Sequence, residues 1–257
     1  MSKTQVTLKH NIMNIERELI ENEHTVAQLA VAYPGALSVF MKHNIDYCCG
    51  GHRSLKDACI RAGLDPNVIM NEIRSERGQD MRPVMRFHQW SNELLADYIV
   101  ENHHTYVKKA IPEVQFFLDK VCAAHGDEDV QLLQIRQHFE DLAEELISHM
   151  NKEEFVLFPA IKRLEARDYG NVPLSLTLQT PLDAMLHEHE IAGNLVKAIR
   201  QLSGNYNPPE YACPTYRITY QKLKEFDDDL MLHIHLENNI LFERVREQTK
   251  PTASFNK

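Results

Sequence analysis

The stretch His149-Met-Asn-Lys-Glu-Glu-Phe-Val-Leu-Phe158 decides the fold, and it returns as His233-Ile-His-Leu-Glu-Asn-Asn-Ile-Leu-Phe242. Both copies read His-x3-Glu-x2-[Val/Ile]-Leu-Phe. A spacing of four residues places the imidazole and the carboxylate on one face of an α-helix, one turn apart. Each copy therefore predicts a helix that presents two metal ligands, and two such helices can face each other across one bundle.

The recurrence of the whole decamer separates this pattern from a chance pair. A single His with Glu four residues later is usually a solvent-exposed helix pair. Exposure to solvent gives no reason for the apolar Val/Ile-Leu-Phe triplet to recur in the same register. The repeat therefore predicts a metal site, and we interpret its Leu and Phe as core packing.

Each copy has a histidine upstream on the preceding predicted helix. From a loop centred near Asp127, the chain runs back to His104 and forward to His149 over nearly equal lengths. At about 1.5 Å per helical residue, both histidines then lie at one height of a helical hairpin. His189 stands in the same relation to His233, although the loop between those helices contains prolines that obscure where the last helix begins.

Helical phase sorts most of the neighbouring histidines. His189 continues an apolar stripe, and so do His233 and Glu237, whereas some adjacent histidines fall on other faces. On the first helix, His103 and His104 both fit the apolar positions, so phase leaves that choice open. We interpret the remaining neighbours as surface or outer-shell histidines: His103, His187 and His235.

With His104 taken from the first helix, four His and two Glu form the candidate set: His104, His149, Glu153, His189, His233 and Glu237. Two ions bridged by two carboxylates use such a set symmetrically, with two imidazoles per ion. Imidazole with carboxylate suits iron, manganese or zinc, and bridged iron recurs in helix bundles. The ferritin-like pattern needs two Glu-x2-His motifs, and Glu101-x2-His104 alone fits it. We expect the nearby acidic residues Glu145 and Glu188 to face solvent, with an outer-shell role as the alternative.

Composition supports an all-α chain. Gly and Pro number 9 and 11 in 257 residues, and no β-strand pattern is convincing. We expect four long helices joined by short loops, an up-down four-helix bundle within a domain at 84–250, with a kink at Pro112. The expected helices span 88–123, 130–167, 181–202 and 214–247.

A smaller helical domain is predicted at 24–78, between an N-terminal extension, 1–23, and a charged linker at 75–83. Helix-start signals occur at Thr25, Ser54 and Asp65, and Gly63 is a stop signal. Within this domain, Asp46-Tyr-Cys-Cys-Gly-Gly51 reads as a turn.

Five cysteines without framework spacing do not describe a disulfide scaffold. Cys48 and Cys49 are adjacent, a geometry that does not easily form an unstrained disulfide. Thiol redox chemistry, metal transfer or nitrosylation is one interpretation, and two small buried residues at a turn is the other. The remaining cysteines, Cys59, Cys122 and Cys213, we expect to be structural.

Charge and hydropathy exclude other classes of function. Lys and Arg number 28 against 37 Asp and Glu, a net charge of −9 without basic runs, which argues against nucleic acid and anionic membranes. Mean hydropathy is −0.41. No apolar run is long enough to span a bilayer, and the N-terminus lacks a signal-peptide core. We therefore expect a cytoplasmic protein.

Taken with these ligands, the turn motif resembles a known family, the iron–sulfur cluster repair di-iron proteins, or Repair of Iron Centres family. The resemblance covers about 24–247 and rests on DYCCGG, a His eight residues before Pro112-Glu113, HMNKEEFVLFP, HEHEIAGN and DDLMLHIHLENNILF. It implies a hemerythrin-like bundle that follows the small domain in the sequence. It also resolves the first helix in favour of His104 and implies that the six candidate residues bind two irons, with Glu153 and Glu237 as bridges beside an oxo or hydroxo ligand.

The role implied by the resemblance is repair of iron–sulfur clusters damaged by nitric oxide or oxidants, with the irons as a labile source and a homodimer as the assembly. Damaged iron–sulfur proteins would be its partners, and an iron donor is favoured over a multiple-turnover enzyme. Binding or reduction of nitric oxide is the main alternative, followed by a gas or redox sensor; oxygen carriage fits less well because the ligand set is symmetric. The resemblance also favours a functional Cys48–Cys49 pair, which would receive or relay iron.

Overall fold

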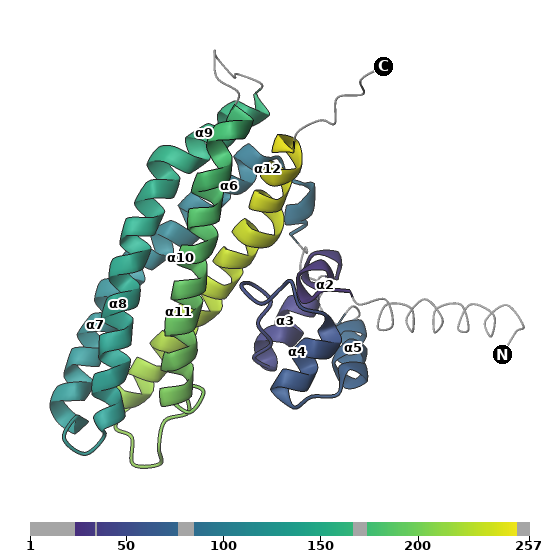
Figure 1. Ribbon diagram of the computed structural model, residues 1–257. Helices are drawn as coiled ribbons and strands as arrows, with labels where there is room; N and C mark the ends of the chain where they lie inside the picture. The colour runs from purple at the N-terminus through teal and green to yellow at the C-terminus, as the bar shows by residue number, and fades with distance from the viewer. Residues whose placement is uncertain (1–23, 34, 77–84, 167–173, 251–257) are drawn as a thin grey trace, which may run out of the picture. The chain divides into compact units, whose positions relative to one another are not determined.

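The computed structural model describes residues 24–33, 35–76, 85–166 and 174–250 (Figure 1). Most of these residues are helical, and the β pairing among them is an isolated bridge between Thr25 and Ser54. The predicted all-α class is therefore confirmed. The chain divides into two compact units, Met1–His88 and Gln89–Lys257. The predicted extension at 1–23 and most of the predicted linker at 75–83 lie outside the described residues.

Within its described residues, the first unit contains four short helices: α2 (Val26–Ala32), α3 (Ala36–Lys42), α4 (Leu55–Ala62) and α5 (Pro66–Ser75). Their ends follow the predicted signals. Thr25, Ser54 and Asp65 each accept a hydrogen bond from a first-turn backbone N–H, which satisfies donors that a helix start leaves unpaired. Gly63 ends α4 in the left-handed region, with φ of 69°, where glycine has no steric penalty.

The second unit is built on four long helices: α7 (Thr105–His125), α8 (Val130–Lys152), α10 (Leu174–Leu202) and α11 (Pro214–Leu236). They run side by side in Figure 1, where α8 packs on α7 and α10, and α11 packs on α7. Short helices extend three of them: α6 (Asn92–Tyr98), α9 (Phe158–Glu165) and α12 (Phe242–Thr249). The predicted four-helix bundle is thus confirmed.

Three π-helical turns interrupt these helices: η3 (Ile99–His104), η4 (Glu153–Leu157) and η5 (Glu237–Leu241). The sequence expectation of continuous helices missed them. A π turn contains one extra residue and is frequent at functional sites. In both copies of the decamer, Glu is the first residue of the turn, Leu is its last, and Phe begins the next helix. The decamer is therefore the sequence of an α-to-π junction.

Two further expectations need correction. The third long helix begins at Leu174 rather than near Pro181, which lies inside it. The first bundle helix does not run without change over 88–123, because a 3-10 turn, η2 (Phe87–Gln89), precedes α6 and the π turn η3 follows it. The α-helix α7 continues through Pro112, and the π turn η3 lies directly before it.

Apolar side chains fill the bundle on both sides of the π turns. Phe139 of α8 and Phe226 of α11 pack edge to face, with ring centroids 5.1 Å apart. Both rings are buried, like Leu118 and Leu132. Among the described residues, none of the helices combines the length and apolar character needed to cross a membrane.

Candidate metal centre

The bundle interior contains a compact cluster of histidine and glutamate. It gathers side chains from three π turns or their flanks and from α10. The structure brings together all six residues of the sequence-predicted set, each at most 3% exposed: His104, His149, Glu153, His189, His233 and Glu237. Burial of this much charge-bearing surface is costly without compensating partners.

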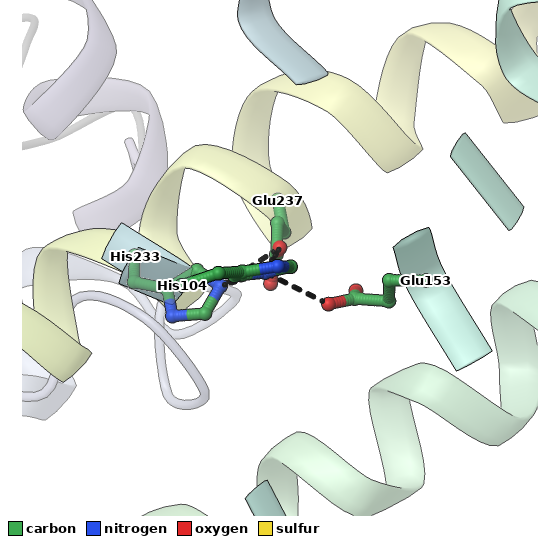
Figure 2. Close-up of side chains that lie close together, drawn as sticks. All are labelled: His104, Glu153, His233 and Glu237. Atoms are coloured by element: carbon green, nitrogen blue, oxygen red, sulfur yellow. Dashed lines mark hydrogen bonds and ion pairs between the residues drawn. The ribbon is translucent and has the colours of Figure 1, made fainter. Parts of the chain in front are cut away.

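Two overlapping groups of four make up the cluster. One is His104, Glu153, His233 and Glu237, drawn in Figure 2. The other joins the same two carboxylates to the remaining imidazoles, His149 and His189. Within each group the candidate ligand atoms all lie within 4.8 Å of one another. Both glutamates therefore belong to both groups, as the bridging expectation requires.

The imidazoles meet in pairs through Nε2. His104 and His233 approach to 3.2 Å between these atoms, and His149 and His189 approach to 2.9 Å. Each pair therefore combines one histidine from a copy of the decamer with one histidine from outside it. The sequence placed His104 and His149 at one height, but the structure pairs each of them with a histidine from the other half of the bundle.

The carboxylates lie between these imidazole pairs. Glu153 Oε2 is 3.3 Å from His104 Nε2 and 3.2 Å from His149 Nε2. Glu237 Oε1 lies 2.9 Å from His233 Nε2, and its Oε2 lies 3.1 Å from His189 Nε2. Each carboxylate thus touches one imidazole of each pair.

Several of these buried atoms lack hydrogen-bond partners. Among the described residues, both oxygens of Glu153 and Oε2 of Glu237 have none, although imidazole nitrogens lie within 3.3 Å of the two Oε2 atoms. Facing ring nitrogens cannot each donate a proton to the other. Cations placed between the imidazoles and the carboxylates would satisfy both sets of atoms, so the donor set fits a metal site.

The charges of the cluster depend on one another. Burial by itself lowers the pKa of His104, but the nearby carboxylates of Glu153 and Glu237 outweigh it and raise that pKa to about 9. The pKa of His149 rises to about 10, because Glu153 again overcomes the effect of burial. Burial dominates at His233, whose pKa is lowered. Within one pair, the pKa of His104 and that of His233 therefore shift in opposite directions.

Outer partners hold the Nδ1 atoms of three imidazoles. His104 Nδ1 donates to Glu154 at 2.8 Å, and His149 Nδ1 donates to Glu188 at 2.9 Å. Lys108 and Lys152 lie 2.6 Å from these two carboxylates, respectively. The solvent-facing expectation is therefore wrong for Glu188, while Glu145 is exposed as expected.

Glu154 and Asn238 were missed by the sequence analysis. Asn238 Oδ1 lies 2.6 Å from His189 Nδ1. Each of the two follows a glutamate of the cluster by one residue, and this shared position after the decamer's Glu is the signal that could have identified them. Such outer contacts fix the tautomer and orientation of metal-binding imidazoles.

Two of the remaining histidines are buried, which excludes the surface interpretation for them. His103 is buried, donates from Nδ1 to Asp229 at 3.0 Å, and stacks on His233 with ring centroids 5.5 Å apart. His235 is also buried, with its Nδ1 2.9 Å from the Asn239 amide. His187 is exposed, so for it the surface interpretation is correct.

The phenylalanines of the repeat contact the cluster as well as the core. Phe158 stacks on His104 at 5.8 Å between centroids, and Phe242 stacks on His189 at 5.9 Å. Each phenylalanine ring thus covers an imidazole that belongs to a different helix. Core packing is therefore an incomplete account of why Phe recurs in the decamer.

In the first unit, Asp46, Cys48 and Cys49 form a separate group that could hold a metal ion. Asp46 Oδ1 accepts from the backbone N–H groups of Cys49 and Gly50 at 3.1 and 2.9 Å. The two Sγ atoms are 3.6 Å apart and form no disulfide. The Asp46 carboxylate therefore joins the two adjacent thiols as a third potential metal ligand.

The thiols differ in accessibility. Cys48 is buried, and its hydrogen bond with Cys49, together with burial, raises its pKa well above the usual value. A Cβ on Gly50 would lie 2.7 Å from Arg53 Nη1 and 3.0 Å from the Asp46 carboxylate, so a larger residue here would have to displace these side chains. The turn therefore holds a protonated Cys48 beside a more accessible Cys49.

Among the other cysteines, Cys59 and Cys122 are buried, as a structural role requires. Cys213 is half-buried and caps α11, with its Sγ accepting from the Tyr216 N–H at 3.4 Å. That hydrogen bond and His125, 3.3 Å away, lower the pKa of Cys213.

Comparison with known proteins places both units. Residues 22–77 match a family described as a domain of unknown function (DUF542), and residues 95–245 match the hemerythrin HHE cation binding domain. The iron–sulfur cluster repair protein YtfE of Shigella boydii serotype 4 is 36% identical over 225 residues, which cover 86% of this chain and 96% of that protein. YtfE of Escherichia coli O81 shows the same identity and coverage, and YtfE of Escherichia fergusonii is 35% identical over the same shares. This chain therefore belongs to the family of YtfE iron–sulfur cluster repair proteins.

Proposed function

We propose that this protein restores damaged iron–sulfur clusters by donating iron held in its bundle. Its YtfE relatives are named as repair proteins, and a cation-binding family matches the bundle. The observation that carries the proposal is the sharing of Glu153 and Glu237 between two groups of ligands. One buried cluster thereby offers adjacent positions for two ions.

Two irons would be held by two imidazoles each, with both glutamates and an oxo or hydroxo ligand between them. His104 and His233 would serve one ion, and His149 and His189 the other. Imidazole nitrogen and carboxylate oxygen are suitable ligands for iron, and this ligand set differs from the cysteine thiolates that hold an iron–sulfur cluster. The bound irons would supply metal that a cluster damaged by nitric oxide or oxidants has lost.

The protein's own residues prepare the site for holding and releasing cations. Buried carboxylate oxygens without hydrogen-bond partners attract cations, and the outer Glu–Lys pairs behind His104 and His149 fix the direction of Nε2. When a cation leaves, protons can return to the imidazoles, because the neighbouring carboxylates favour their charged form at His104 and His149.

The Asp46-Cys48-Cys49 group would receive iron on its way to a client. Thiolate sulfur is a soft ligand that binds iron well, and the carboxylate adds a third donor. Replacing both Cys48 and Cys49 with Ser should lower repair while leaving the iron content and helicity of the bundle unchanged. Full repair by the double variant would make the pair structural, and loss of bundle iron would replace the relay with coupled folding.

A turnover experiment tests the proposed function. The iron-loaded chain is mixed with a hydro-lyase whose [4Fe–4S] cluster has been damaged by nitric oxide, and recovered activity is measured against the iron supplied. A donor restores activity in proportion to its iron and is then spent. Many turnovers of nitric oxide with iron retained would instead make the protein a reductase, and reversible gas binding without either activity would make it a sensor.

A further inference from the structure

The two ion positions differ in how their imidazoles are supported from outside. Each imidazole of the cluster directs Nε2 inward, which leaves Nδ1 to an outer partner. Three have one: Glu154 behind His104, Glu188 behind His149 and Asn238 behind His189. His233 Nδ1 is buried, and among the described residues it has no hydrogen-bond partner.

Two neighbours of His233 bond to each other rather than to its Nδ1. Asp229 lies one helical turn before His233 on α11, but its Oδ1 accepts from His103 Nδ1 at 3.0 Å. The His103 ring lies against the His233 ring, with centroids 5.5 Å apart and planes at 12°. An aromatic ring thus packs against His233, and the carboxylate one turn away is bonded to that ring. His233 is positioned by stacking and by Glu237 rather than by an outer hydrogen bond.

In their other outer contacts, the two ion positions match. Each position has one imidazole backed by a Glu–Lys pair, with Nζ to carboxylate distances of 2.6 Å in both cases. Each also has one imidazole under a phenylalanine ring, His104 at one position and His189 at the other. The glutamates are shared. The difference between the positions therefore lies in the second imidazole, His233 against His189.

We propose that the two positions hold iron unequally, and that the ion between His104 and His233 leaves first. The inference rests on the proposed two-iron site and specifies which ion is donated. An outer partner keeps a ligating imidazole basic and correctly turned, and its loss typically weakens metal affinity about 10–100-fold. Asn238, 2.6 Å from His189, provides this support at the second position. His103 is then a positioning residue whose pairing with Asp229 keeps the first position weak.

Release kinetics test the proposal on the full chain. The protein is loaded anaerobically with two ferrous ions and mixed with excess ferrous chelator, and the coloured complex is followed with time. The parent should release iron in two phases of one ion each, with rates about tenfold or more apart. A single phase containing both ions would overturn the proposal.

Variants of the outer partners assign the phases. Glu154→Gln weakens support of His104 and should accelerate the fast phase alone, whereas Glu188→Gln should accelerate the slow phase alone. Asn238→Leu removes the partner of His189 and should bring the slow rate toward the fast one. The matched control is Glu145→Gln, at an exposed position on α8, which should change neither phase. Acceleration of the slow phase by Glu154→Gln would reverse the assignment and overturn the proposal.

An opposite change guards against variants that simply fold badly. Asn238→Asp gives His189 a charged acceptor, so it should slow the slow phase, an effect that misfolding does not produce. Release in two phases without repair of any cluster would contradict the proposed function and leave this inference intact. Repair of the cluster combined with equal release rates for the two ions would support the proposed function and overturn this inference.

Discussion

At the residue scale, the two shared glutamates separate this cluster from a pair of independent sites. Glu153 contacts His104 and His149, and Glu237 contacts His233 and His189, so each carboxylate links both imidazole pairs. A histidine belongs to one group, while a glutamate belongs to both. Loss of a histidine and loss of a glutamate should therefore have different stoichiometric consequences.

We predict that Glu153→Gln loses both ions, whereas His149→Ala retains about one ion per chain, because metal binding needs the full set of deprotonated ligands at each position. The measurement is elemental analysis of the purified chains after iron loading and desalting. Circular dichroism serves as the check on folding. If Glu153→Gln and His149→Ala retain equal amounts of iron, the carboxylate does not bridge.

At the element scale, the π turns η4 and η5 connect a long helix to its short extension, α8 to α9 and α11 to α12. In η4, Glu153 faces the cluster while Phe155 and Val156 are 75% and 62% exposed. The next residue but one, Phe158, begins α9 and covers His104. One extra residue thus allows a ligand and the ring that covers a partner ligand to face inward from consecutive helices.

Deleting Val156 should close this turn to an α-helical one and rotate α9 by about 100° relative to α8. Glu153 and Phe158 then cannot both keep their places, so iron content should fall below half of the parent value and the melting temperature should fall. Far-UV circular dichroism should change little. The measurements are metal analysis and thermal unfolding.

The control for this deletion is Val156→Ala, which removes the same exposed side chain without changing the register. A surface substitution of this kind usually changes stability by no more than about 0.5 kcal/mol. A deletion variant that binds iron and melts like Val156→Ala would show that the extra residue has no positioning role.

At the scale of the whole molecule, the candidate metal cluster lies within one unit of the chain. All six of its residues belong to the unit at Gln89–Lys257, as does Trp90, the one tryptophan in the sequence. Tryptophan fluorescence therefore reports unfolding of the bundle unit, and far-UV circular dichroism reports helices of both units. The two signals can separate the effect of metal on each.

Removing iron should lower the unfolding midpoint that Trp90 reports, because an ion that binds the folded state alone stabilises it by about 2.7 kcal/mol at a hundredfold excess over Kd. For a unit of this size that corresponds to a shift of about 5–10 °C per ion. The measurement compares iron-loaded and chelator-treated chains by fluorescence. An unchanged midpoint would show that the buried cluster does not bind iron in the folded chain.

The sequence by itself determined the helical class, the bundle and the identity of the six clustered residues. It could do so because an i, i+4 spacing and an apolar stripe specify a helix face without reference to other helices. Local signals were equally sufficient at Thr25, Ser54 and Gly63, where a cap depends on residues within one turn.

Only the tertiary structure decided which histidines pair, which side chains lie behind them and where the π turns fall. Pairing of His104 with His233 depends on the rotation and height of separate helices, which packing of the whole bundle sets. Glu188 looks solvent-facing by phase, and it turns to His149 because Lys152 and the imidazole are brought within reach across two helices. Periodicity describes one helix at a time, whereas these contacts belong to pairs of helices, and for that reason they follow from the fold rather than from the spacing.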